Sequence, residues 1–202
     1  MTLITPSIRA ELTALYTSPS RHYHNLTHIT TLLSFLTTHR HHLSDPDAVE
    51  AAIWFHDAIY EPQHKKPGYS ESKSAELAVS RLSGTVEPRR LEWIRKAILA
   101  TARHEEEPGE FEGAEAEDVK VFLDMDLSIL AAEEGEFEGY ERGVREEYGS
   151  AVTGGASLKP KWYRTTFSCL AEVLGSTPIW CARFWDFQWE STWIPSYCLS
   201  HG

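Results

Sequence analysis

Apolar side chains recur at three- and four-residue steps along most of the chain, the spacing that places them on one face of an α-helix. Within residues 25–41, for example, Leu26, Ile29, Leu32 and Leu36 follow this spacing. No segment shows the two-residue alternation of a strand, so the sequence predicts an all-α fold. Helices are expected over residues 7–17, 25–41, 46–60, 70–82, 88–104, 117–123, 127–132, 134–149 and 160–174.

Turn and capping residues separate these helices. Asp45-Pro46 indicates a helix start, because Asp is a good N-cap and Pro fits the first helical position. Residues 61–68 are rich in Pro, His, Lys and Gly and predict a loop. A chain of 202 residues without internal repeats fits one domain with a sizeable core. We expect this domain over residues 1–178, followed by a divergent, aromatic-rich tail at 179–202.

A histidine and an aspartate follow the most apolar of these segments. Ala51–Phe55 has the pattern of one buried helical turn, and His56 and Asp57 come directly after it. Adjacent helical positions point about 100° apart, so both side chains can reach one buried site only if a common partner lies between them. A metal ion is such a partner, because it offsets the cost of burying an imidazole and a carboxylate. The alternative is a helix C-terminus with a hydrogen-bonded histidine and a solvated aspartate.

Two further segments supply residues of the same kinds. Upstream, Arg21–Ile29 contains three histidines, and downstream, Phe122–Leu127 contains two aspartates. The chain thus offers His, then His-Asp, then Asp, each within a helix-like apolar pattern. This order resembles the H…HD…D signature of the HD superfamily of metal-dependent phosphohydrolases, and the resemblance implies an HD-type helical bundle.

The resemblance is closer to one branch of that superfamily, the predicted hydrolases with R-x-Y-H-N-L-x-H, W-F-H-D-x-x-Y, E-x-x-S-A, A-T-x-x-H and F-L-D-x-D-L-x-I-L. The matching stretches are Arg21–Ile29, Trp54–Tyr60, Glu71–Ala75, Ala100–His104 and Phe122–Leu130, with further matches at Tyr140, Arg145–Tyr148 and Arg164. The likeness extends from about residue 7 to about 180. Five matches in the same order are more specific than H…HD…D alone.

The resemblance implies one divalent metal ion held by His28, His56, Asp57 and Asp126. His24 shares a helix face with His28, and the two could bind a metal as a pair, but the family pattern gives the ligand role to His28 and places His24 on the substrate side. Asp126 fits the family's final Asp-Leu pair better than Asp124. Asp124 would then cap its helix or hold a ligand histidine through its second nitrogen. Two His and two Asp suit Mn²⁺, Co²⁺, Ni²⁺, Fe²⁺, Zn²⁺ or Mg²⁺.

Phosphate-ester hydrolysis needs more than a metal. A carboxylate must take a proton from the attacking water, and the resemblance favours Glu71 for this catalytic role. The alternative is a first-turn glutamate favoured by the helix dipole. His104 matches A-T-x-x-H and is expected to contact the substrate, although it could also be a second-metal ligand or a plain helix-terminal histidine. The candidate cations for a phosphate are Arg21 and Lys73, with Arg145 and Arg164 as further matches.

Charge and composition narrow the class of partner. Thirty acidic and nineteen basic residues give a net charge of -11, which disfavours binding to nucleic acid or an anionic membrane. No apolar stretch approaches a membrane span and no signal pattern opens the chain, so a cytoplasmic location is expected. The acidic runs at 110–118 and 133–147 are typical of solvated faces. The tail at 179–202 is expected to pack on the domain or on a second subunit of a homodimer, or to fold poorly.

Taken together, these features predict a metal-dependent phosphohydrolase that acts on a small phosphate ester such as a nucleotide. Two alternatives stay open. A non-catalytic metal- or nucleotide-binding module would keep the ligands but lack a working acid/base. An HD-fold oxygenase with two irons would need more bridging ligands than one H…HD…D set supplies. The substrate itself is not readable, because fold does not fix it.

Overall fold

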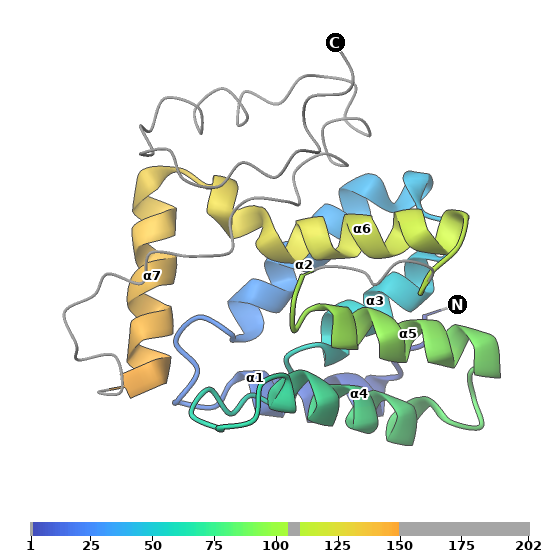
Figure 1. Ribbon diagram of the computed structural model, residues 1–202, viewed down its shortest axis with the longest axis horizontal. Coiled ribbons are helices and arrows are strands. Elements are labelled where there is room, and N and C mark those ends of the chain that lie inside the picture. The colour runs from blue at the N-terminus through green and yellow to red at the C-terminus, as the bar shows by residue number, and fades with distance from the viewer. Residues whose placement is uncertain (1, 105–109, 150–202) are drawn as a thin grey trace, which may run out of the picture.

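The computed structural model describes residues 2–104 and 110–149, and all regular elements within these ranges are helical (Figure 1). The elements are α1 (Pro6–Tyr16), α2 (Leu26–His39), η1 (Arg40–His42), α3 (Pro46–Phe55), α4 (Tyr69–Leu82), α5 (Pro88–Ala100), α6 (Ala114–Asp126), η2 (Leu127–Ala131) and α7 (Glu134–Tyr148). The all-α prediction is therefore confirmed for the described part of the chain. The helix expected at 160–174, Arg164 and the tail at 179–202 lie outside the described residues. None of the described helices is both long and apolar enough to cross a membrane.

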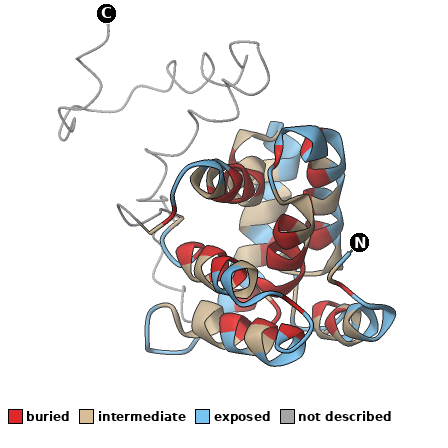
Figure 2. Ribbon diagram, turned by 90° about the vertical axis from the view of Figure 1, so that its right-hand side faces the viewer, coloured by how far each residue is buried: buried red, intermediate tan, exposed pale blue. Residues whose placement is uncertain are grey.

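Helix α3 forms the centre of the core. Ala48, Val49 and all residues of Ala51–Phe55 are buried, and the helix packs against α1, α2, α4, α5 and α6. A helix that is apolar on all sides is stable only where other elements cover it. Figure 2 shows the buried residues gathered on the helix faces that point into the bundle. The location matters for function, because His56 and Asp57 follow the last residue of this central helix.

Two carboxylates fix the start of α3. Asp45 accepts a hydrogen bond from the N–H of Ala48 at 3.0 Å, as the sequence predicts for an N-cap, and it also pairs with the guanidinium of Arg90. The buried carboxylate of Asp118 accepts hydrogen bonds from the N–H and hydroxyl of Ser44 and from the N–H of Asp45, at 2.7–2.9 Å. The prediction of a solvated face at 110–118 is thus wrong for Asp118, whose carboxylate ties α6 to the loop before α3.

Helix α3 ends at Phe55, five residues before the expected end at residue 60. The guanidinium of Arg21 donates hydrogen bonds to the carbonyls of Asp57 and Ala58 at 2.7 and 2.8 Å. The hydroxyl of Tyr16 donates to the carbonyl of Trp54 at 3.0 Å. These side chains donate to carbonyls that would accept backbone N–H groups if the helix were longer. The chain therefore turns at His56, which puts His56 and Asp57 at a helix end instead of within a helix.

Helices α5 and α6 also differ from the expected bounds. The sequence predicts short helices at 117–123 and 127–132, whereas α6 is continuous from Ala114 to Asp126 and leads directly into η2. Helix α5 ends at Ala100 instead of residue 104. The N–H groups of residues 101–104 still donate to carbonyls three or four positions earlier, and this stretch ends at His104, which has a left-handed φ of 53°. Asp126 consequently lies at the last position of α6, close to the end of α5.

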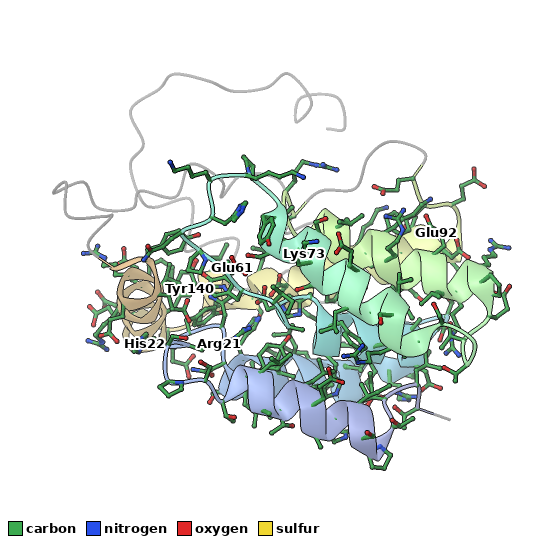
Figure 3. The ribbon with its side chains drawn as sticks, turned by 90° about the horizontal axis from the view of Figure 1, so that it is seen from below. Arg21, His22, Glu61, Lys73, Glu92 and Tyr140 are labelled. Atoms are coloured by element: carbon green, nitrogen blue, oxygen red, sulfur yellow. The ribbon has the colours of Figure 1, made fainter. Side chains whose placement is uncertain are left out.

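Helix α7 stands at the edge of the bundle, steeply inclined to α5 and α6 (Figure 1). Only Gly143 and Glu147 of this helix are buried. A Cβ atom built on Gly143 would lie 3.1 Å from the Cβ of Tyr23 and 3.2 Å from the backbone of His22. Gly143 therefore lets α7 approach the loop that precedes α2. Figure 3 shows α7 end-on, beside the segment that carries His22.

Candidate metal centre

Three helices bring the H…HD…D residues to one place. His28 lies in the first turn of α2, which begins after the N-cap Asn25. His56 and Asp57 follow α3, and Asp126 is the last residue of α6. The four side chains are nearly enclosed, since His28 and His56 are 4 % and 1 % exposed and Asp57 and Asp126 are 13 % and 10 % exposed. Residues separated by up to 98 positions in sequence, from His28 to Asp126, thus share one enclosed site.

Their polar atoms converge closely. Nε2 of His28 lies 3.3 Å from Nε2 of His56, 3.0 Å from Oδ1 of Asp126 and 3.9 Å from Oδ2 of Asp57. Nε2 of His56 lies 3.1 Å from Oδ2 of Asp57 and 3.4 Å from Oδ1 of Asp126. Metal–ligand bonds of about 2.0–2.2 Å would place neighbouring ligand atoms roughly 3.0–3.6 Å apart. Four of the five separations lie in this range, and the fifth, 3.9 Å from His28 to Asp57, is slightly longer.

The second nitrogen of His56 fixes which nitrogen faces the cluster. Nδ1 of His56 is 2.8 Å from the carbonyl oxygen of Ile53, and a carbonyl can only accept, so Nδ1 carries the proton. Nε2 is then a lone-pair donor in the neutral ring, which is the form that binds metals. This support for the His56 ring comes from the backbone of α3. The sequence analysis offered Asp124 as the residue that could hold a ligand histidine, but for His56 a backbone carbonyl does so.

The charges in the cluster favour a cation. Burial by itself lowers the pKa of His56, but Asp57 and Asp126 outweigh it and raise that pKa well above its ordinary value. Burial by itself raises the pKa of both carboxyls, but His56 and its neighbours outweigh it and hold the pKa of Asp57 and of Asp126 below the ordinary value. Both shifts arise because two buried carboxylates lie beside two imidazoles. The same two carboxylates would stabilise a bound divalent cation.

His28, His56 and Asp57 could accordingly hold a metal ion. Their nitrogen and oxygen donors suit a first-row transition metal or Zn²⁺, and the carboxylates also admit Mg²⁺. Oδ1 of Asp126 lies 3.0 Å from Nε2 of His28 and 3.4 Å from Nε2 of His56, so Asp126 could supply a fourth donor atom. Asp124, two positions earlier in α6, is also buried. Which of the two aspartates binds a metal stays a prediction from the sequence, which favours Asp126.

His104 extends the cluster on the side of Asp126. Its Nε2 lies 3.1 Å from Oδ2 of Asp126, the oxygen that does not face His28. The imidazole is 35 % exposed, so it lies at the edge of the site. His104 thus lies beside Asp126 at the edge of the site, and its expected contact with a substrate stays a prediction.

His24 lies beside His28 and is held by a residue of α7. Its ring is stacked on Tyr60, with centroids 4.2 Å apart, and is edge-on to His28 at 6.1 Å. Nδ1 of His24 is 2.7 Å from Oε2 of Glu147. The prediction that Glu147 lies on a solvated face is wrong, because its side chain is fully buried. The only sequence signal for Glu147 is the motif match at residues 145–148.

The candidate cations for a phosphate have other partners in this structure. Arg21 donates to the carbonyls of His24, Asp57 and Ala58, so it ties the start of α2 to the end of α3. Lys73 pairs with Glu76 at 2.6 Å on the outer surface of α4. Arg145 pairs with Glu141 at 3.4 Å along α7. The labelled side chains of Arg21 and Lys73 belong to different parts of the bundle in Figure 3.

Glu71, the expected proton acceptor, lies in the first turn of α4 and is partly exposed. Its charge raises the pKa of Tyr148 at the end of α7, after the larger effect of burial. Glu71 is thus near enough to Tyr148 for its charge to act there, and its expected role as proton acceptor stays a prediction.

Fold and site together define an all-α protein with an enclosed His/Asp cluster that could hold a metal ion. Comparison with family models, curated proteins and solved structures finds no match to this chain. The likeness to the HD superfamily therefore stays a prediction from the sequence motifs.

Proposed function

We propose that this chain is a metal-dependent phosphohydrolase of HD type that cleaves a small phosphate ester such as a nucleotide. One observation carries the proposal. The four residues of the H…HD…D order lie in or next to three different helices, and yet their side chains converge. Nε2 of His28 and Nε2 of His56 lie 3.0–3.9 Å from each other and from the carboxylate oxygens of Asp57 and Asp126. Enclosing two carboxylates and two imidazoles costs free energy, and a bound metal ion would offset that cost.

The chain's own residues would divide the work as follows. His28, His56, Asp57 and Asp126 would hold the ion. A bound divalent ion would lower the pKa of water at the site and withdraw charge from a phosphoryl group. His104 steadies Asp126 through the 3.1 Å contact to Oδ2 and, from its partly exposed position, can reach a substrate oxygen. Glu71 and His24 are the two candidates for moving the proton, one from α4 and one beside His28.

The net charge of the chain supports a small substrate. The net charge of -11 opposes binding of a long polyanion, whereas a single phosphate can be neutralised locally by the ion and by histidines at the site edge. The two histidines at that edge are His24 and His104.

Metal analysis of the purified chain tests the proposal directly. We expect one divalent ion per chain, and we expect Asp57→Ala and Asp126→Ala to lower the metal affinity by more than about 100-fold, which exceeds the usual effect of losing a residue that only supports a ligand. Asp47→Ala is the matched control. It also removes a carboxylate, but one in the first turn of α3 that pairs with Arg40. The variants and the parent chain are then screened for phosphate release from nucleotides and other esters.

Each outcome has a definite meaning. Full metal occupancy in Asp57→Ala would refute the assignment of the site. Loss of metal in Asp124→Asn but not in Asp126→Asn would move the fourth ligand. Tight metal binding without phosphate release from any ester would favour the non-catalytic metal-binding module.

A further inference from the structure

Glu147 is a buried carboxylate on a helix that is otherwise largely exposed. Its Oε1 accepts hydrogen bonds from three consecutive backbone N–H groups, those of His22, Tyr23 and His24, at 2.8, 2.8 and 2.9 Å. Its Oε2 lies 2.7 Å from Nδ1 of His24. Burial by itself raises the pKa of Glu147, but the hydrogen bonds from His24 and from the backbone outweigh it and lower that pKa. Four donors around one side chain identify it as an ionised carboxylate.

This arrangement fixes the proton on the His24 ring. A carboxylate only accepts hydrogen bonds, so the nitrogen that contacts it, Nδ1, must carry the hydrogen. In the neutral ring, Nε2 then keeps its lone pair. Among the described residues, no hydrogen bond reaches Nε2 of His24.

The remaining contacts of His24 place it against the candidate metal centre. The ring is stacked on Tyr60 on one face, with centroids 4.2 Å apart and planes 29° apart. It is edge-on to Tyr23 and His28, with centroids at 4.9 and 6.1 Å. Asp57 is near enough for its charge to act on His24. Aromatic packing and the contact to Glu147 therefore leave the ring little freedom to turn.

We propose that Glu147 is a positioning residue that holds His24 as the Nδ1–H tautomer, so that Nε2 offers a hydrogen-bond acceptor to water or substrate at the metal centre. The functional part of this inference rests on the proposed phosphohydrolase activity. The tautomer itself does not, and it can be measured without any substrate. Helix α7 gains a role by this inference, because it delivers one buried carboxylate to a ring that lies 123 positions earlier in the chain.

Glu147→Gln is the informative substitution. A glutamine has only one side-chain oxygen. The three backbone N–H groups would hold this oxygen at the position of Oε1. Its NH₂ group would then face Nδ1 of His24, where two donors cannot meet. The proton must therefore move from Nδ1 to Nε2, and Nε2 loses its lone pair. The substitution keeps the size of the side chain and the hydrogen bonds to the backbone.

Long-range ¹H–¹⁵N spectra of histidine-labelled protein report the tautomer of each neutral ring. Burial lowers the pKa of His24, but Asp57 and Glu147 outweigh it and raise that pKa, so spectra are recorded from about pH 9 upward until the His24 signals are those of a neutral ring. The chain has ten histidines, and His24→Asn assigns the signal by its loss. We expect Nδ1–H for His24 in the parent chain and Nε2–H in Glu147→Gln. Glu146→Gln is the matched control. It removes a carboxylate one residue earlier, from an exposed pair with His22 at 3.0 Å, and should leave the His24 signal unchanged.

The kinetic readout completes the test. Glu147→Gln should keep its metal and its KM but lose kcat by about 10²–10⁴-fold, the scale of a lost or wrongly oriented proton-transfer group. An Nε2–H tautomer in the parent chain would overturn the inference without any variant. So would a folded Glu147→Gln that keeps Nδ1–H on His24. A switched tautomer with unchanged kcat, or loss of kcat confined to Glu71→Gln, would overturn the functional part and leave the proton to Glu71.

Discussion

At the scale of single residues, His104 combines a strained backbone with a contact to the candidate metal centre. It is the one non-glycine in the described residues with a left-handed backbone, at φ 53°, and its Nε2 lies 3.1 Å from Oδ2 of Asp126. A side chain in this region costs roughly 1 kcal/mol relative to glycine. Such strain persists where surrounding structure determines the conformation, and it is common at functional sites. At His104 the left-handed conformation places the imidazole beside Asp126.

We therefore expect His104→Gly to be more stable than His104→Ala by about 1 kcal/mol, because both lose the imidazole but only glycine relieves the strain. Urea unfolding without added metal measures the difference. Arg103 is the control position, since its φ is not left-handed, and there alanine should be the more stable by about 0.5–1 kcal/mol. An advantage of alanine at both positions would contradict this account of His104.

At the scale of elements, α7 shows how a largely exposed helix can be docked by two side chains. Gly143 and Glu147 are four positions apart and so share one helix face, the face that contacts the loop before α2. Gly143 permits the close approach and Glu147 supplies the hydrogen bonds. The three glycines of α7 consequently have different roles, because a Cβ on Gly139 or Gly135 would meet no atom within 4 Å.

Gly139→Ala should stabilise the protein by about 0.5–1 kcal/mol, since alanine lowers the entropy cost of the helix without a clash. Gly143→Ala should instead destabilise it by about 1–2 kcal/mol, because backbone atoms of His22 lie 3.2 Å from the new methyl group and overpacking outweighs the helical gain. Thermal unfolding of the two variants side by side measures both signs. Stabilisation by both substitutions would show that the loop before α2 yields easily and that Gly143 is not needed for docking.

At the scale of the whole molecule, ionised buried carboxyls make stability depend on pH. Hydrogen bonds hold the pKa of Glu147 below its ordinary value in spite of burial, and neighbouring histidines do the same for Asp57 and Asp126. A carboxyl with a lowered folded-state pKa stabilises the fold above its unfolded-state pKa. That contribution is lost as the pH falls through the folded-state value. The fold should therefore lose stability in acid.

We expect the free energy of unfolding of the parent chain to fall as the pH drops below about 4.5, near the unfolded-state pKa of glutamate. Glu147→Gln should begin with lower stability and show a shallower fall, because glutamine does not titrate. Glu146→Gln, which changes an exposed side chain, should follow the parent. Urea midpoints measured from about pH 7 to pH 3 give the slopes. Equal slopes in the parent and in Glu147→Gln would mean that Glu147 does not stabilise the fold as a carboxylate.

The sequence by itself determined the helices and the order of the candidate ligands. The 3.6-residue periodicity and the cap at Asp45-Pro46 depend only on residues a few positions apart, so they could be read locally, and α1, α2, α4 and α7 lie close to their expected ranges. His28, His56, Asp57 and Asp126 were named from motif order, and the fold brings them together.

Only the tertiary structure decided what depends on distant partners. Helix α3 stops at Phe55 because Arg21, from another loop, takes the carbonyls that follow. Glu147 lies in an acidic run that looks solvated, yet it is buried because three N–H groups and an imidazole more than 120 positions away stabilise its charge. The physical reason is general. Helix formation is favoured by neighbours in sequence, whereas burying a polar group is possible only where the fold supplies its partner.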